Sequence, residues 1–168
     1  TTDSARHMFC IRLYSFYEEA QRDSALHYAE LSIQLARKNN QHIATANGLN
    51  RKAYQLMTAG KYAASYQSLL EAYALLEAYP HENQIWMLQP LATNEQDHAL
   101  SWSFANHMLG LLMYRTNNRS EAMKYYRKGK HFAEIANSPF RILIGDMNIG
   151  QMHYFDGQLD SALIYERK

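Results

Sequence analysis

Apolar residues along the chain recur with the period of an α-helix. Leu49, Ala53 and Leu56 follow one another at intervals of four and three positions, which places them on one helical face. No window shows the sustained alternation of apolar and polar residues that is typical of a β-strand. The pattern therefore predicts an all-α chain. The expected helices cover residues 3–20, 23–38, 41–58, 62–79, 94–116, 119–136, 139–156 and 159 onward.

Residue types at the expected helix ends support these boundaries. Ser138 followed by Pro139 is a start signal, because serine caps a helix and proline suits its first position. Thr93 and Gln96 match a capping box, in which we expect the Gln96 side chain to reach back to the cap. Two glycines stand in expected turns, where a left-handed backbone conformation is needed: Gly60 and Gly157.

Small residues recur in register along the predicted helices. One set marks every second helix at spacings of 40, 57 and 40 residues: Ala25, Ser65, Ala122 and Ala162. Twelve positions earlier the first unit holds Leu13, but the other three hold small residues: Ala53, Gly110 and Gly150. One spacing thus carries 17 extra residues, and residues 80–96 are their expected location.

Gly110 stands inside a predicted helix, where a glycine costs about 1 kcal/mol relative to alanine. Two antiparallel helices can approach closely only where neither carries a bulky side chain. We therefore expect Gly110 to face Ala122, with larger residues such as Leu109, Met113 and Tyr126 at the flanks.

The recurring unit resembles the tetratricopeptide repeat (TPR). The segments "LGLLMYRTNNRSEAMKYYRKG" (109–129) and "IGQMHYFDGQLDSALIYERK" (149–168) carry the pattern best, and residues 52–72 and 12–32 carry variants of it. The resemblance covers nearly the whole chain outside residues 80–96. The chain departs from the family in its 40-residue period, against about 34 residues, and in lacking the usual proline after the second helix. It also lacks the usual tryptophan of the first helix, whose places hold Phe9, Leu49, Asn106 and Asp146.

The resemblance implies one right-handed superhelical array of about four antiparallel helix hairpins, with an insertion at about residues 80–96. The units would cover residues 3–38, 41–79, 94–136 and 139–168. Repeats with such long helices are similar to the sensory or regulatory arrays of bacterial histidine kinases and transcription regulators, especially in Bacteroidetes-type bacteria.

The resemblance also implies that the first helices of the hairpins line a concave wall that binds a protein or peptide. The alternative is that these side chains, rich in tyrosine, belong to mixed packing. The wall would be formed by Tyr14, Tyr17, Asn50, Arg51, Tyr54, Met57, His107, Leu111, Tyr114, Met147, Gln151 and Tyr154. A chaperone adaptor that grips a carboxylate is not expected, because the family's places for its lysines and asparagines hold Cys10, Tyr14, Arg51, Phe104 and Met108.

The insertion has an apolar centre between two prolines. In one interpretation it folds onto the array and buries Trp86 as a local plug. In the other it presents Trp86 and Met87 to a partner or to a second copy of the chain, so that self-association stays open.

Composition excludes several function classes. The formal net charge is +1, which is unlike the basic footprint of a nucleic-acid-binding protein. A short basic group is expected to be solvated surface rather than a phosphate track: Lys124, Arg127, Lys128 and Lys130. The chain has no run of 18 apolar residues, so membrane insertion is not predicted for this segment. The single cysteine, Cys10, allows no internal disulfide, and the composition suits either the periplasm or the cytoplasm.

Candidate catalytic groups are scattered. Among eight histidines, none stands four residues from another within a predicted helix, so no metal or other cofactor is expected. The chain shows no glycine-rich phosphate loop and no nucleophile elbow, and Cys10 is expected to be a packing residue. We therefore expect a non-catalytic segment.

Three functions stay open for such a segment. It could be the sensory or regulatory input domain of a larger bacterial signalling protein, which is the first hypothesis. It could instead be a free-standing scaffold for protein complexes, or a cytoplasmic receptor for a peptide pheromone. A start without methionine and an end within a predicted helix suggest a piece of a longer protein, in which a membrane anchor or a kinase domain would lie outside the segment.

Overall fold

The computed structural model describes residues 2–87 and 89–166, and every regular element among them is an α-helix. This confirms the all-α prediction. The helices are α1 (Asp3–Tyr17), α2 (Arg22–Lys38), α3 (His42–Thr58), α4 (Tyr62–Ala78), α5 (Asn94–Arg115), α6 (Arg119–Ile135), α7 (Pro139–Phe155) and α8 (Leu159–Glu166). Most bounds lie within one or two residues of those expected, but α1 ends at Tyr17, three residues early.

Five of the turns between helices share one geometry. Each has three residues, and its central residue has a left-handed φ between 51° and 74°: Asn40, Gly60, Asn117, Asn137 and Gly157. The residue after it donates its N–H to the carbonyl five positions earlier, as Gln41 does to Ala36 at 2.9 Å. Five of the helices next to these turns have 17 residues each, α2, α3, α4, α6 and α7, whereas α5 has 22. One helix and one turn span 20 residues, so a hairpin spans the 40-residue period.

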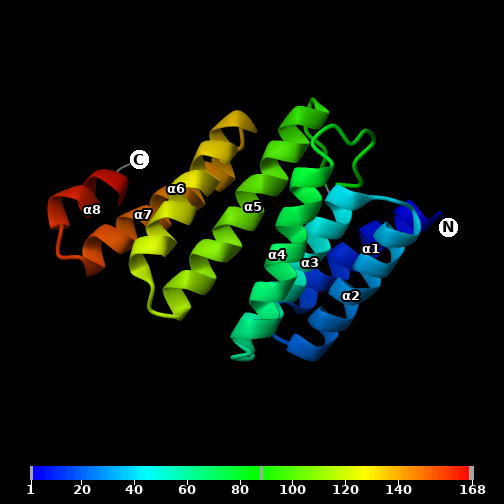
Figure 1. The fold of residues 1–168 in the computed structure, drawn as a ribbon, viewed down its shortest axis with the longest axis horizontal. Coiled ribbons are helices and arrows are strands. Elements are labelled where there is room, and N and C mark those ends of the chain that lie inside the picture. The colour runs from blue at the N-terminus through cyan, green and yellow to red at the C-terminus, as the bar shows by residue number, and fades with distance from the viewer. Residues whose placement is uncertain (1, 88, 167–168) are drawn as a thin grey trace.

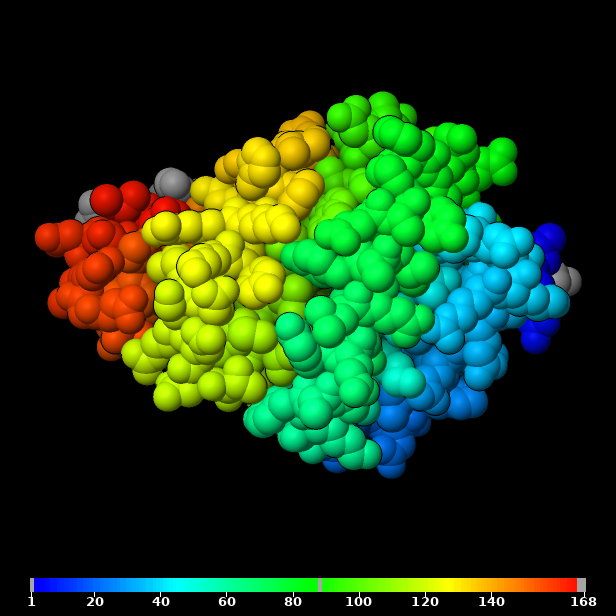
Figure 2. Space-filling view, viewed as in Figure 1, coloured from blue at the N-terminus to red at the C-terminus, as the bar shows by residue number. Residues whose placement is uncertain are grey.

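Each helix packs against the next one in the chain, and α3 also packs against α5. Figure 1 shows the hairpins following one another from the N-terminal end of the molecule to the C-terminal end. In the space-filling view of Figure 2, the sequence colours succeed one another across the surface in the same order. Side-chain hydrogen bonds also join the odd-numbered helices: Gln55 Nε2 to Tyr14 Oη (3.2 Å), Asn47 Nδ2 to Ser101 Oγ (3.0 Å) and Asn148 Nδ2 to His107 Nδ1 (3.1 Å). We call the surface formed by α1, α3, α5 and α7 the odd-helix face.

Small residues occupy the helix crossings. Nine alanines of the described residues have no exposed surface, and they include the repeat positions Ala25, Ala53 and Ala122. Where Ala53 meets the next helix, the Ser65 hydroxyl donates to its carbonyl oxygen at 2.8 Å. Such contacts require that the two backbones lie close together, so the repeated small residues serve the helix packing for which they were singled out.

The predicted role of Gly110 needs a correction. A Cβ atom on Gly110 would lie 2.6 Å from two ring carbons of Tyr126, so its nearest neighbour is that aromatic ring and not Ala122. The glycine makes room for a buried tyrosine. At the corresponding Gly150, a Cβ would meet Tyr165 Cβ at 3.1 Å and the Ala162 carbonyl at 3.6 Å, which is closer to the expected pairing.

Two predicted caps also differ in detail. Thr93 Oγ1 accepts from the Gln96 N–H at 3.1 Å, as a capping residue should. The Gln96 Oε1 atom, however, is buried without a partner among the described residues, so the returning half of the capping box is absent. Ser138 occupies the cap position before Pro139, but its side chain makes no capping bond. Because α5 begins at Asn94, the segment between α4 and α5 is residues 79–93 rather than 80–96.

Candidate functional site

The structure divides the twelve side chains of the expected wall into three groups. Tyr14, Asn50 and Met57 are buried. Met57 packs against Leu69 and Leu109 in a hydrophobic cluster, so its side chain cannot contact a ligand as expected. Six are partly buried: Tyr17, Arg51, Tyr54, His107, Leu111 and Tyr114. Three are exposed, all on α7: Met147 (63%), Gln151 and Tyr154 (61%).

Several tyrosines of this set already have partners. The Tyr14 hydroxyl donates to Glu18 Oε1 at 3.0 Å, and the Tyr54 hydroxyl donates to Glu19 Oε1 at 3.1 Å. The Tyr17 ring is stacked on Tyr28, with centroids 5.8 Å apart. Burial raises the pKa of Tyr14 and Tyr54, so both hydroxyls stay neutral. These tyrosines therefore contribute to packing, as the mixed-packing alternative expects, and the binding role of the wall stays a prediction.

Two arginines from different helices meet at one aromatic ring on the odd-helix face. The Arg51 Cζ atom, on α3, lies 5.5 Å from the centroid of the Phe104 ring on α5. The Arg141 Cζ atom, on α7, lies 4.6 Å from the same centroid. Both distances are typical of cation–π contacts. We call Arg51, Phe104 and Arg141 the arginine–phenylalanine cluster.

The electrostatics of the cluster are unusual for arginine. Burial lowers the pKa of Arg51. Burial and the nearby Arg51 charge lower the pKa of Arg141 to about 10. Among the described residues, neither guanidinium forms an ion pair with a carboxylate. Glu18 interacts with both arginines electrostatically, but its own pKa is raised by burial and its carboxylate accepts from Tyr14. The cluster therefore retains positive charge that the described residues do not neutralise.

The sequence pattern alone did not indicate Arg141 or the role of Phe104. Phe104 was noted only as a mismatch to a chaperone adaptor, and Arg141 stands nine positions before Gly150, outside the places that the resemblance assigns to the wall. Its long side chain reaches back to α5. A signal was nevertheless available, because an arginine two residues after a helix-starting proline lies at the end of the helix where its positive charge is least favourable.

Two buried polar side chains on α1 and α3 have no hydrogen-bond partner among the described residues. They are His7, through both ring nitrogens, and Asn50, through both amide atoms. Burial and then the Arg51 charge lower the pKa of His7 to about 4, so the ring is neutral at pH 7. Buried polar atoms without partners are unfavourable by about 1–3 kcal/mol each.

Residues 85–87, in the segment between α4 and α5, lie on the array instead of projecting from it. Ile85 is buried in a core cluster with Ile43 and Leu76, and Met87 packs on that cluster. The Trp86 ring is partly buried, with its centroid 5.5 Å from that of His7. This arrangement corresponds to the plug interpretation, and it leaves Trp86 and Met87 only partly accessible to a partner.

Glu82 fixes this segment by capping α3 from 40 residues away. Its carboxylate accepts from the backbone N–H of His42 at 2.9 Å and of Ile43 at 3.3 Å. We expect Glu82→Ala to lower the free energy of unfolding by about 1–2 kcal/mol, because two N–H groups at a helix start lose an anionic acceptor. Urea denaturation measures the change. Glu77→Ala, at an exposed site on α4, is the control, and an equal effect of both variants would contradict the capping role.

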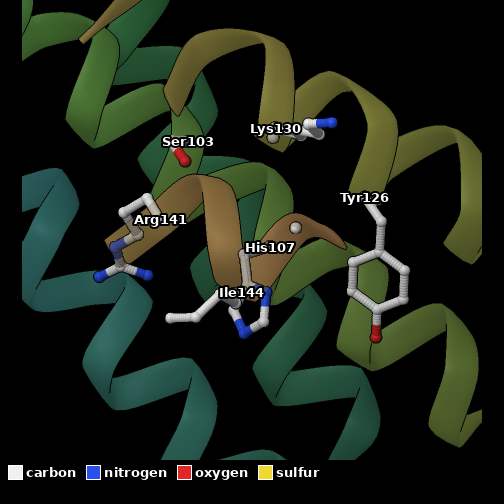
Figure 3. A pocket seen from close by; sticks show the side chains of 8 residues that line it. Ser103, His107, Tyr126, Lys130, Arg141 and Ile144 are labelled. Carbon is white, nitrogen blue, oxygen red and sulfur yellow. The ribbon is translucent and has the colours of Figure 1, made fainter. Parts of the chain in front are cut away.

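A small cavity lies between α5, α6 and α7 (Figure 3). Its volume is about 10 Å³, which is room for about one water molecule. Figure 3 shows it between His107 and Ser103 of α5, Tyr126 and Lys130 of α6, and Arg141 and Ile144 of α7. Lys130 donates to Asp146 at 2.8 Å, and the Arg141 guanidinium belongs to the cluster described above. The cavity is too small to hold an organic ligand.

The basic residues of α6 do not form a continuous track. Lys124 pairs with Glu121 at 2.6 Å, and Lys130 pairs with Asp146 at 2.8 Å. The Lys128 ammonium lies 5.4 Å from the ring centroids of both Tyr73 and Trp102. Three of the four lysines and arginines in this group therefore already have partners, which is consistent with the surface role expected for them.

The structure also places the groups that could support metal or thiol chemistry. The described residues include no cluster of three His, Cys, Asp or Glu side chains that could hold a metal ion. Cys10 is buried, and burial raises the pKa of its thiol. Within residues 2–87 and 89–166, no helix has the length and apolar character to cross a membrane.

No protein-family model matches the chain, and no curated protein does so either.

Proposed function

We propose that this chain is a non-catalytic module of the TPR type that binds a protein or peptide on its odd-helix face. We also propose that the chain forms a right-handed superhelical array of four hairpins. It is supported by the 40-residue hairpin period, by the succession of helices along the molecule and by the hydrogen bonds between α1, α3, α5 and α7.

The observation that carries the proposal is the arginine–phenylalanine cluster. Arginine and aromatic side chains dominate the energetics of many protein interfaces, because they combine apolar area with directional polar contacts. Exposed Met147 and Tyr154 extend the same face along α7, and both residue types also favour protein contacts.

We further propose that the module is the sensory or regulatory input of a larger bacterial signalling protein. The support is the resemblance of its long-helix repeats to the arrays of histidine kinases and transcription regulators. The complete reading frame tests this part: a kinase or DNA-binding segment in the same protein is expected, and a full gene without any output domain would contradict it.

Selection from a random peptide library on the immobilised protein tests the binding function. Peptides that bind in the micromolar range or tighter are expected. We expect Tyr154→Ser, on the odd-helix face, to lower the affinity for the selected peptides by about tenfold. The reason is that an exposed aromatic contact contributes about 1–2 kcal/mol to binding. Tyr66→Ser, at an exposed site on α4, should leave the affinity unchanged. Loss of binding in Tyr66→Ser but not in Tyr154→Ser would place the site elsewhere.

A further inference from the structure

We propose that residues 85–87 form an intramolecular strap, which occupies the part of the odd-helix face at α1 and α3 and which a bound peptide displaces. This inference rests on the proposed function and concerns the regulation of the same face. The occupant of the covered part is thus a segment of the chain itself. A peptide that extends from the arginine–phenylalanine cluster towards α1 binds fully only when the strap has been released.

Side-chain contacts place the strap against the odd-numbered helices. The centroid of the Trp86 ring lies 5.5 Å from that of the His7 ring on α1. The Met87 sulfur accepts from Asn47 Nδ2 on α3 at 3.3 Å, and the same nitrogen donates to Ser101 Oγ on α5 at 3.0 Å. The strap therefore contacts one of the side chains that join the odd-numbered helices to one another.

The strap also adjoins the arginine–phenylalanine cluster. Asn47 stands four positions before Arg51, which is about one helical turn, and Arg51 Nη1 donates to the Asn47 carbonyl oxygen at 3.0 Å. The pKa of His7 is lowered by burial first and then by the charge of Arg51, so the arginine also lies near the ring that Trp86 contacts. Arg51 and the strap thus share two neighbours, and a ligand that passes from Arg51 towards α1 meets Trp86.

Few bonds within the segment hold the strap in shape. In the described part of segment 79–93, the backbone hydrogen bonds between its own residues are two, at 3.4 Å and 3.0 Å. The segment is attached to the array by the buried Ile85 side chain, by the Trp86 N–H that donates to Gln41 Oε1 at 3.1 Å, and by the Glu82 cap of α3. Segments with so little regular structure of their own open more readily than the helices beneath them.

The docked strap covers a polar ring without giving it a hydrogen bond. His7 has no exposed surface, and neither of its ring nitrogens has a partner among the described residues. Burial of unpaired polar atoms is unfavourable, so the state of His7 offsets part of the gain from burying Ile85. Release of Trp86 opens the imidazole to water. The docked and released states are therefore closer in free energy than a purely apolar contact would make them, as a displaceable segment requires.

Hydrogen–deuterium exchange of the wild-type protein tests the displacement without any substitution. The probe is a peptide selected from the random library, at a concentration that saturates the protein. We expect binding to speed the exchange of backbone amides in residues 82–87 by about threefold or more. The turn at residues 136–138, between α6 and α7, is the control and should not change. Unchanged or slower exchange in residues 82–87 would overturn the inference.

Variants measured by isothermal titration test whether the strap competes with the peptide. Trp86→Ser, which removes the ring that contacts His7, should tighten binding by about tenfold if about nine in ten free molecules have the strap docked. Glu82→Gln, which loosens an attachment away from the covered surface, should tighten binding by about threefold. His81→Ser, at an exposed site of the same segment, is the matched control and should bind as the wild type does.

The outcomes separate this inference from the proposed function. Weaker binding by Trp86→Ser would show that Trp86 belongs to the binding surface, and unchanged binding would show that the peptide does not reach it. Either result would overturn the strap and leave peptide binding intact. If circular dichroism shows that Trp86→Ser does not fold, the exchange experiment on the wild-type protein decides. A library that yields no binding peptide would overturn the proposed function, and this inference with it.

Discussion

Acidification from pH 7 to pH 4 is expected to lower the free energy of unfolding by several kcal/mol, mainly through two histidines. His7 and His107 each have a pKa lowered to about 4, by burial first and then by the charge of Arg51 or Arg141. Well above pH 6.5 the two imidazole rings are neutral in both the folded and the unfolded chain. Between pH 6.5 and 4 the unfolded chain binds protons that the folded chain does not, so stability falls as the pH falls.

The expected size is about 3 kcal/mol for fully buried His7 and somewhat less for partly buried His107, whose charge solvent partly screens. His107 also loses the hydrogen bond that its Nδ1 accepts from Asn148. Glu18 and Asp97 have a raised pKa and act in the opposite direction at lower pH, so the range from pH 6.5 to 5 is the most informative.

Urea denaturation at half-unit pH steps measures this dependence. His7→Leu should be more stable than the wild type at pH 7, because it removes two buried polar atoms without partners, and it should show a shallower acid slope. His131→Leu, at an exposed site, is the control. A wild-type stability that is flat between pH 7 and 5 would contradict the burial of both histidines.

Gly110→Val is expected to destabilise the protein by about 3 kcal/mol, the upper end of the usual range for overpacking. Even the first added atom would lie 2.6 Å from the Tyr126 ring, and that ring is 2% exposed and has little space to move. Valine would have to displace the ring or separate α5 from α6. Chemical denaturation at pH 7 measures the loss.

A double-mutant cycle identifies the cause. Tyr126→Leu alone should be destabilising, because it leaves a void beside Gly110. In the Tyr126→Leu background, however, Gly110→Val should cost at least about 1 kcal/mol less than it does alone. Additive effects would mean that the glycine serves some other purpose, such as the pairing with Ala122 that the sequence suggested.

The all-α class and the helix bounds could be predicted because the residues that mark helix crossings and turns recur at regular intervals along the chain. Small residues 40 positions apart mark the crossings, and glycines at 60 and 157 mark two turns. Three further turns use asparagine at the same place: Asn40, Asn117 and Asn137. Asparagine tolerates a left-handed φ better than most residues, so the sequence marks these turns at asparagines as well as at glycines.

The candidate site was less predictable because it depends on contacts between distant helices. Helical register places Met57 on the same face as Tyr54, but Met57 turns into the core where α3 meets α4 and α5. Arg141 reaches Phe104 across 37 residues of sequence by means of a long, flexible side chain. Register alone gives the direction of a Cβ atom and not the reach of a guanidinium, so the cluster required coordinates.

The central claim is that the odd-helix face is the ligand-binding surface. Chemical-shift mapping with ¹⁵N-labelled protein and a selected peptide tests it most directly. We expect the largest changes in chemical shift on α3, α5 and α7, at residues around Arg51, Phe104 and Arg141. Chemical-shift changes concentrated on α2, α4 and α6, with the signals of Arg51, Phe104 and Arg141 unchanged, would contradict the claim.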